Sequence, residues 1–322
     1  MLNRSVRTLL AAILVIVTLS SMGLALGGCK KTGSATFTVK KWDDVQKTID
    51  NAKSNDIIDL SKLSTPDKQH VLEVGNGINM TFVGNPDELF YGVAINCGGE
   101  NSITLHNIRL VSTNNQTPST LQFTSWGNQL TLLGDNVLIN AQAPEKLGHG
   151  AAVGVADGTT LTISGTGSLT ARGGSCGAGI GGGLGLSAGT IIIRESSIVA
   201  YGGGMENTSG APAIGGGLYG SGGTISISGG KVIAIAGPNS AAIGDGMNAS
   251  GGVIGISGGD ITAETNENSE EAAIKGTLET LPGAYTWWAG KNNSVGQSDG
   301  KSFPDDSFKN SSAYKFIRIR AR

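Results

Sequence analysis

The sequence predicts an all-β protein built as a right-handed, single-stranded parallel β-helix of about eight three-strand rungs. Two observations lead to this fold. Glycine makes up 52 of the 322 residues, which is more than double the usual share, and apolar residues recur about every 30 residues in the second half of the chain. Between the glycines, apolar residues alternate with Ser or Thr, which is the period of a strand and not of a helix.

Four columns of apolar residues repeat in step, with successive spacings close to 30, 34 and 29 residues. The columns are Val153, Ile180, Ile214, Ile243 and Ile274; Ile163, Ile193, Ile227 and Ile256; Leu169, Ile198, Val232 and Ile261; and Ala171, Ala200, Ala234 and Ala263. Each repeat therefore holds three short strands separated by glycine-rich turns. Because the turns recur in the same place, each strand is expected to pair with its counterpart in the next repeat, in three parallel sheets with right-handed connections. The column of small alanine side chains marks a narrow corner in the cross-section of the predicted β-helix.

The two ends of such a stack are predicted to be capped, because exposed parallel edges invite aggregation. Trp42, Val45 and Ile49 lie on one face of a short amphipathic helix that would cover the first rung. At the other end, Tyr285–Trp288 and Tyr314–Arg320 are the aromatic-rich strands. We interpret them as capping strands, with a platform for sugar binding as the alternative.

The N-terminal residues have the pattern of a bacterial export signal. Arg4 and Arg7 precede the apolar run Leu9–Leu19, and Leu26–Cys29 resembles a lipobox, in which the cysteine is lipidated. An uncleaved anchor or a plain secretory signal is the alternative. The expected organisation is a signal peptide at 1–28, a tether at 29–36 and a β-helix domain at 37–322, divided into an N-terminal cap and first strand at 37–60, glycine-rich repeats at 148–276 and a C-terminal cap at 277–322. We therefore expect an extracytoplasmic protein, lipid-anchored to the cell membrane at Cys29.

Charge argues against a nucleic-acid partner, because the formal net charge is −2 and the pI is about 5.9. Two cysteines remain besides Cys29. In the predicted register Cys97 and Cys176 lie three rungs apart, roughly 14 Å, which exceeds the ~7 Å that a disulfide spans. The sequence therefore predicts two free thiols.

The N-terminal segments resemble a known superfamily. Phe37–Val39, the helix at Trp42–Ala52 and the strand Asp56–Leu60 are similar to the start of pectin-lyase-like right-handed parallel β-helix proteins. The repeats Ala213–Gly217 and Ile227–Gly230 look like those of carbohydrate-binding, adhesin-like surface lipoproteins of Gram-positive bacteria. This resemblance implies the fold but not the ligand, since the superfamily includes lyases, hydrolases, esterases and binding proteins.

The resemblance also suggests an alternative, a polysaccharide lyase or glycoside hydrolase that acts on pectin-like acidic glycans. In the predicted register no carboxylate lies above another, and only Asp260 and Glu264 share a strand face, so they are weak candidates for a calcium site. The motif Gly148-His149-Gly150 resembles one of polygalacturonases, but the acidic pair that precedes it in that family is missing here. We therefore expect no catalytic residues and no required cofactor, with calcium as an open possibility.

The candidate binding residues are hydroxyl and aromatic side chains. Thr224, Ser226 and Ser228 belong to an outward ladder of Ser and Thr on the second strand, although such residues also stack well for structural reasons. Tyr201 lies in an apolar outward strip of the third strand, and Trp126 and Tyr219 lie in turns where a ring could stack on a sugar. These residues favour a cell-surface lipoprotein that binds polysaccharide or cell-wall glycan, or adheres to it, without catalysis.

Overall fold

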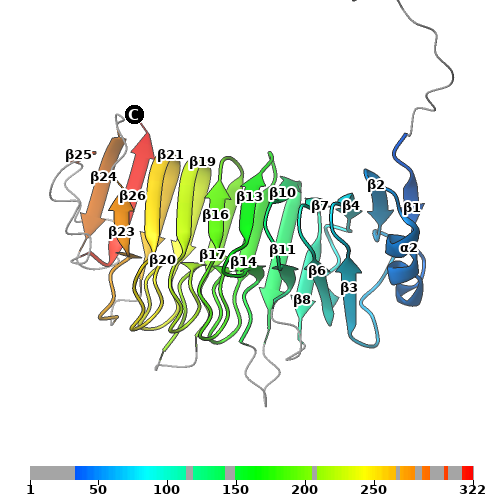
Figure 1. Cartoon of the computed structure of the whole chain (residues 1–322), viewed down its shortest axis with the longest axis horizontal. Coiled ribbons are helices and arrows are strands. Elements are labelled where there is room, and N and C mark those ends of the chain that lie inside the picture. Colours follow the sequence, from blue (N-terminus) through cyan, green and yellow to red (C-terminus); the bar gives the residue numbers. More distant parts are fainter. Residues whose placement is uncertain are drawn as a thin grey trace, which may run out of the picture. The chain divides into compact units, whose positions relative to one another are not determined.

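The computed structural model describes residues 33–113, 119–141, 149–204, 209–265, 269–279, 285–290, 301–303 and 314–321. The chain is nearly all β, with 50% strand and 4% helix, and Ser34–Arg322 forms one compact unit whose strands lie side by side in chain order (Figure 1). The predicted signal peptide, Cys29 and most of the tether lie outside the described residues. None of the described helices is long and apolar enough to cross a membrane.

One parallel sheet has eight strands, and its order follows the order of the chain. Its strands are β3 (His70–Val74), β6 (Val93–Cys97), β9 (Leu121–Phe123), β12 (Val153–Val155), β15 (Ile180–Gly181), β18 (Ile214–Gly215), β20 (Ile243–Gly244) and β22 (Ile274–Lys275). Each strand therefore pairs with its counterpart one repeat away, an arrangement compatible with the predicted parallel β-helix.

The second sheet has 18 strands and contains two parallel ladders. The first ladder is formed by β1 (Thr36–Thr38), β2 (Asp56–Asp59), β4 (Asn79–Val83), β7 (Ser102–His106), β10 (Asn128–Leu133), β13 (Thr160–Ser164), β16 (Thr190–Ile193), the first halves of β19 (Thr224–Ile235) and β21 (Val253–Glu264), and β23 (Thr277–Glu279). The second is formed by β5 (Phe90–Tyr91), β8 (Arg109–Ser112), β11 (Asp135–Asn140), β14 (Ser168–Arg172), β17 (Ser197–Tyr201) and the second halves of β19 and β21.

The predicted columns of apolar residues are confirmed by the strand register. Ile180 pairs with Ile214 and Ile214 with Ile243 in the eight-stranded sheet. All members of the four columns are buried, with exposed fractions of at most 1%. Stacked isoleucine and alanine rows thus form a continuous core that no single repeat could bury by itself.

The predicted second and third sheets are separate ladders in the earlier repeats but are joined into one sheet at β19 and β21. Gly229 and Gly230, which we expected in a turn, lie inside the 12-residue strand β19, where the pairing with β21 is irregular. A Cβ atom at Gly229 would lie 2.0 Å from the Arg194 carbonyl oxygen. Glycine therefore lets the chain bend sharply against the previous repeat without leaving the sheet.

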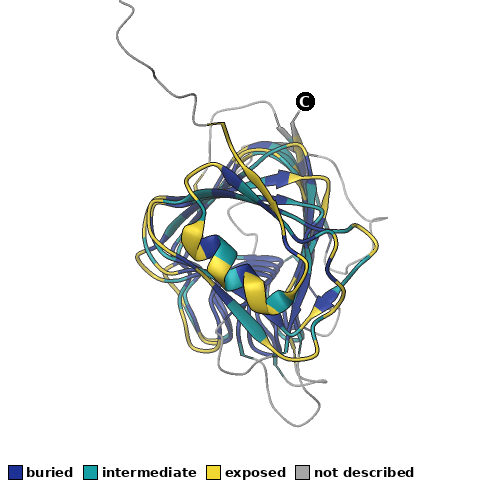
Figure 2. Cartoon of the chain, turned by 90° about the vertical axis from the view of Figure 1, so that its right-hand side faces the viewer, coloured by how far each residue is buried: buried dark blue, intermediate teal, exposed yellow. Residues whose placement is uncertain are grey.

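The predicted N-terminal cap is present. A 3₁₀ turn, η1 (Trp42–Asp44), leads into the helix α2 (Val45–Asn51), which lies across the N-terminal end of the strands (Figure 2). Val45 and Ile49 are buried in the core. The Trp42 ring packs edge-on against Phe90 at 5.0 Å, and its indole N–H donates a hydrogen bond to the Ser64 carbonyl oxygen at 2.6 Å.

At the C-terminal end, the expected aromatic strands are β24 (Tyr285–Gly290) and β26 (Phe316–Ala321), and β25 (Lys301–Phe303) pairs with β24. Strand β26 pairs antiparallel with both β21 and β24. An antiparallel strand has a different hydrogen-bond spacing from the parallel ladder, so the parallel stacking ends there.

Cys97 and Cys176 are both buried free thiols, as predicted. Burial raises the pKa of each thiol, and the nearby Glu73 raises that of Cys97 further. Both thiols therefore remain protonated and unreactive at neutral pH.

Candidate functional site

Two of the predicted binding residues are exposed aromatic side chains in turns. Trp126 is 63% exposed and Tyr219 is 53% exposed. Trp126 lies between β9 and β10 and Tyr219 lies between β18 and β19, so both turns lead from the eight-stranded sheet into the larger one. Three rungs separate them, or roughly 14 Å at ~4.8 Å per rung.

The turn that carries Tyr219 has an unusual backbone conformation. Tyr219 lies five residues after Ile214, just as Gly185 and Asn248 lie five residues after the paired Ile180 and Ile243. The φ angles are 67° for Gly185, 67° for Tyr219 and 56° for Asn248. Glycine and asparagine tolerate this left-handed region, whereas a tyrosine there is strained by about 1 kcal/mol.

Backbone hydrogen bonds stack this turn on its neighbours. The Gly185 N–H donates to the Leu218 carbonyl oxygen at 2.7 Å, and the Gly246 N–H donates to the Gly220 carbonyl oxygen at 2.9 Å. These hydrogen bonds therefore fix the position of each turn relative to the turn of the neighbouring repeat.

Two leucines of the preceding turn are exposed beside Tyr219. Leu184 is 39% exposed and Leu186 is 53% exposed, and the Leu186 carbonyl oxygen accepts a hydrogen bond from Gly217 at 3.0 Å. We call Leu184, Leu186 and Tyr219 the turn patch. Sequence reasoning missed the leucines, although two leucines within a glycine-rich turn were a signal that could have identified them.

The Asp245 carboxylate fastens the Tyr219 turn to the following one. Its Oδ1 atom accepts hydrogen bonds from the backbone of Gly222 at 2.7 Å, from the backbone of Gly252 at 2.8 Å and from the Ser221 hydroxyl at 3.3 Å. Asp245 is buried, with 2% of its surface exposed. The earlier repeats have Gly182 and Gly216 at this position, so this bracing is specific to the turn after Tyr219.

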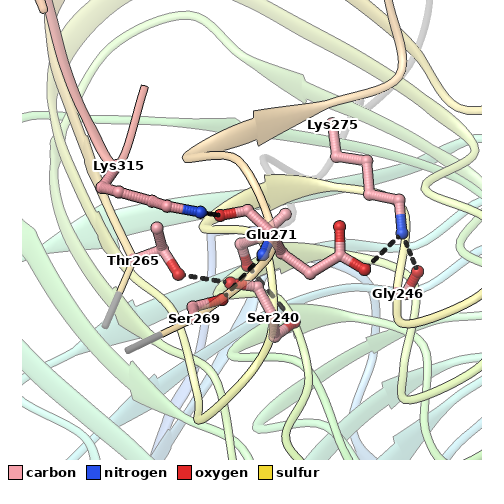
Figure 3. Close-up of polar contacts among 8 residues, drawn as sticks. Ser240, Gly246, Thr265, Ser269, Glu271, Lys275 and Lys315 are labelled. Atoms are coloured by element: carbon pink, nitrogen blue, oxygen red, sulfur yellow. Dashed lines mark hydrogen bonds and ion pairs between the residues drawn. The ribbon is translucent and has the colours of Figure 1, made fainter. Parts of the chain in front are cut away.

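Figure 3 shows a second polar network, which fastens the last of these turns to the C-terminal cap. The Lys275 ammonium donates to the Gly246 carbonyl oxygen at 3.0 Å and to a Glu271 carboxylate oxygen at 2.8 Å. The Lys315 ammonium donates to the Glu271 carbonyl oxygen at 2.9 Å. Lys275 follows Gly181, Gly215 and Gly244 in the same column, so the repeat pattern is interrupted where the stack ends.

The predicted hydroxyl ladder is continuous at Thr224 and interrupted at Ser226. Thr224 and Ser228 are exposed and Ser226 is half-buried on β19, directly after the Tyr219 turn. Ser226 pairs with Ile192 on one side and Gly255 on the other. Thr224 continues a row of threonines with Thr190 and Thr160 on the two preceding strands, and this row ends at Val253.

Tyr201 lies apart from the turn patch, at the end of β17 in the second ladder. Its ring is half-buried and lies 5.8 Å from the guanidinium of Arg172 on the neighbouring strand. The rest of the predicted apolar strip, Val199, Ile233 and Ile235, is also half-buried.

Asp260, one of the two weak calcium candidates, forms an ion pair with arginine. The Arg318 guanidinium donates to both of its oxygens, at 3.1 Å and 2.9 Å, and Arg320 lies 3.8 Å away. This hydrogen bonding to Arg318 lowers the pKa of Asp260, whereas burial raises the pKa of Glu264. Asp260 therefore contacts the C-terminal strand β26 through an ion pair, which no local sequence pattern indicated.

His149 lies outside the strands, and its carbonyl oxygen accepts a hydrogen bond from Leu184 at 2.9 Å. Gly148 of the same motif lies outside the described residues. In the described part of the chain, no three His, Cys, Asp or Glu side chains are grouped closely enough to hold a metal ion.

Comparison of the chain with protein-family models, with curated proteins and with solved structures finds no match in any of the three. The functional argument therefore depends on the residues and their geometry. Of the predicted site residues, Tyr219 lies in the turn that leads into β19, which carries Thr224, Ser226 and Ser228, while Trp126 and Tyr201 belong to other repeats.

Proposed function

We propose that the chain is a non-catalytic carbohydrate-binding or adhesion lipoprotein of the bacterial cell surface, anchored at Cys29. Its ligand is a polysaccharide or cell-wall glycan that contacts the turns between the two sheets. The turn patch, with Trp126 on an earlier turn, supplies apolar and aromatic surface for the faces of sugar rings. Thr224, Ser226 and Ser228 supply hydroxyl groups for hydrogen bonds to the same ligand.

The observation that carries this proposal is the conformation of Tyr219. A ring 53% exposed at a φ of 67° contributes little packing and carries a backbone cost. Neighbouring turns use glycine and asparagine at this position and adopt the same conformation without that cost. The backbone conformation therefore does not favour tyrosine there, and contact with a ligand accounts for it. Exposed apolar groups gathered beside it are typical of a binding surface.

We further propose that the two sheets close into a right-handed parallel β-helix of about eight rungs, related to the pectin-lyase-like superfamily. The parallel pairing of each strand with its counterpart one repeat away supports this winding, and parallel connections are almost always right-handed. Such a winding presents equivalent turns one rung apart, which suits a ligand that itself repeats.

The test is retention of the purified mature chain on polygalacturonate and on a panel of neutral glycans, with and without calcium. New unsaturated or reducing ends are assayed in the same samples. We expect retention on at least one glycan without new chain ends. New chain ends would instead support the alternative, a polysaccharide lyase or hydrolase.

The variant that tests the turn surface is Trp126→Ala, and Tyr91→Ala is its matched control, since Tyr91 is also exposed (52%) but lies on β5 in the second ladder. We expect Trp126→Ala to weaken retention several-fold and Tyr91→Ala to leave it unchanged. Equal losses in both variants would contradict the assignment of the ligand to the turns.

A further inference from the structure

A cavity of about 350 Å³ lies on a different part of the chain, at the turns that follow β11, β14 and β17. It spans three successive repeats, and its turns lead into the eight-stranded sheet, whereas the turn patch lies on turns that leave that sheet. The residues that line it are Ile139, Asn140, Ala141, Arg172, Gly173, Gly174, Ser175, Gly202, Gly203 and Gly204. None of these residues is acidic, and one is an arginine.

The Arg172 side chain is exposed and lacks a carboxylate partner among the described residues. Its neighbours across the ladder are Ile139 on β11 and Tyr201 on β17, both uncharged. The Tyr201 ring lies 5.8 Å from the guanidinium, so one face of the cation packs on an aromatic surface. The N–H groups at the edge of the guanidinium remain available to an anion in the cavity.

Ser175 supplies a second, independent observation. Only 4% of its surface is exposed, and its hydroxyl has no hydrogen-bond partner among the described residues. A buried hydroxyl without a hydrogen-bond partner costs free energy. Such a group therefore requires an explanation, and a bound ligand that accepts or donates the missing hydrogen bond provides one. Asn140, also 4% exposed, donates only a long hydrogen bond of 3.5 Å to the Ala151 carbonyl oxygen.

Half of the residues that line the cavity are glycines, and they leave space because they have no side chain. A Cβ atom at Gly203 would lie 1.5 Å from the Gly174 carbonyl oxygen, and one at Gly173 would lie 2.1 Å from that of Gly177. These positions must therefore be glycine for the turns to stack. The Gly173 and Gly203 N–H groups already donate to Tyr201 and Gly177, which leaves the recognition of a ligand to the side chains.

We propose that this cavity binds the oxyanion group of a small ligand, a carboxylate, sulfate or phosphate, between the Arg172 guanidinium and the Ser175 hydroxyl. Arg172 is the main donor, because a guanidinium pairs with two oxygens of such a group at once. Ser175 adds the hydrogen bond that it lacks in the structure. The site is independent of the turn patch and does not require the proposed carbohydrate binding.

Isothermal titration of the mature chain with acetate, sulfate and phosphate, in a low-salt buffer free of these anions, tests the site. We expect saturable binding of at least one anion. Arg172→Gln should weaken it at least tenfold, since it removes charge-assisted hydrogen bonds to the anion. Arg194→Gln is the matched control, because Arg194 is an exposed arginine that follows β16 and is absent from the cavity lining.

Ser175→Ala separates a ligand-binding hydroxyl from a structural one. We expect anion affinity to fall about threefold while the thermal midpoint of unfolding stays equal or rises, because an unpaired buried hydroxyl is removed. A lowered midpoint with unchanged affinity would assign Ser175 a structural role and contradict the site. Absence of saturable binding of all three anions, or equal losses in Arg172→Gln and Arg194→Gln, would also overturn the proposal.

The source of the oxyanion is identified by a second titration, with a carboxylated monosaccharide and its neutral form. Tighter binding of the carboxylated sugar than of acetate indicates that the oxyanion is part of a larger ligand. Equal affinities of the sugar acid and acetate indicate a site for the free anion. In both cases the loss in Arg172→Gln identifies the same cavity.

Discussion

Tyr219 and Gly185 occupy the same position in neighbouring turns, and both have a φ of 67°. For glycine this conformation carries no steric cost, whereas the Cβ atom of an L-residue approaches a carbonyl oxygen. Asn248 fills the position in the next repeat, with a φ of 56°. The backbone conformation favours Gly or Asn at all three positions, which supports the proposal that the tyrosine ring contacts a ligand.

Tyr219→Asn is predicted to raise the free energy of unfolding by up to about 1 kcal/mol, because asparagine tolerates the left-handed region better. Chemical denaturation measures this change. Tyr219→Phe serves as the control, since it keeps both the strain and the ring, and it should leave stability unchanged. A loss of stability in Tyr219→Asn would show that the ring packs against the protein.

Asp245→Ala is predicted to lower the free energy of unfolding by about 2 kcal/mol, because the buried N–H groups of Gly222 and Gly252 lose their acceptor. Denaturant titration checks this value. Ser221→Ala removes only the weaker 3.3 Å hydrogen bond to the same carboxylate and should cost far less. Equal effects of the two substitutions would contradict the bracing role of Asp245.

His70 makes the N-terminal cap sensitive to pH. Burial, and next the charge of Lys68, lower the pKa of His70, while Asp43 and Asp67 oppose this shift. Since its folded pKa lies below the unfolded value of about 6.5, the folded state favours neutral His70. The contribution of neutral His70 to the free energy of unfolding is therefore complete above about pH 6.5. It decreases as the pH falls through the lowered pKa of the folded state.

Thermal unfolding of the wild type at about pH 7.5 and pH 5 measures this dependence. His70→Gln, which does not titrate, should show a smaller decrease in the midpoint between these pH values. An identical decrease in the wild type and the variant would place the pH dependence elsewhere.

The ion pair of Asp260 with Arg318 is predicted to hold β26 on β21. Asp260→Asn should lower the free energy of unfolding by about 1 kcal/mol, a modest value because both side chains are partly exposed to solvent. Arg320→Gln is the control, since Arg320 lies 3.8 Å from the carboxylate and is more exposed. Because Arg318 lowers the pKa of Asp260, this contribution is present above about pH 4 and is lost as the pH falls through the folded pKa. A larger effect of Arg320→Gln would contradict the assignment.

The repeat columns made the sheets predictable, because stacked strands bury the same position in every repeat, as Ile180, Ile214 and Ile243 do. The bend at Gly229 within one strand was not predictable, since glycine favours turns and tight strand bends alike. The partner of Asp260 was also missed, because Arg318 lies 58 residues away in sequence.

Of the candidate site, sequence reasoning identified Tyr219 as a turn residue but not its positive φ, which became evident only from the paired turns. It missed the exposed Leu184 and Leu186, and it missed the cavity beside Arg172, which three successive turns form together. Features that depend on one repeat packing on the next are visible only in three dimensions.

The most direct test of the proposed function measures glycan retention and stability together in the wild type, Tyr219→Asn and Tyr219→Phe. We predict that Tyr219→Asn loses most of its retention while its stability is equal or higher, and that Tyr219→Phe keeps both. Such a result separates a ligand-binding ring from a structural one. Unchanged retention in Tyr219→Asn, on a glycan that retains the wild type, would contradict the account.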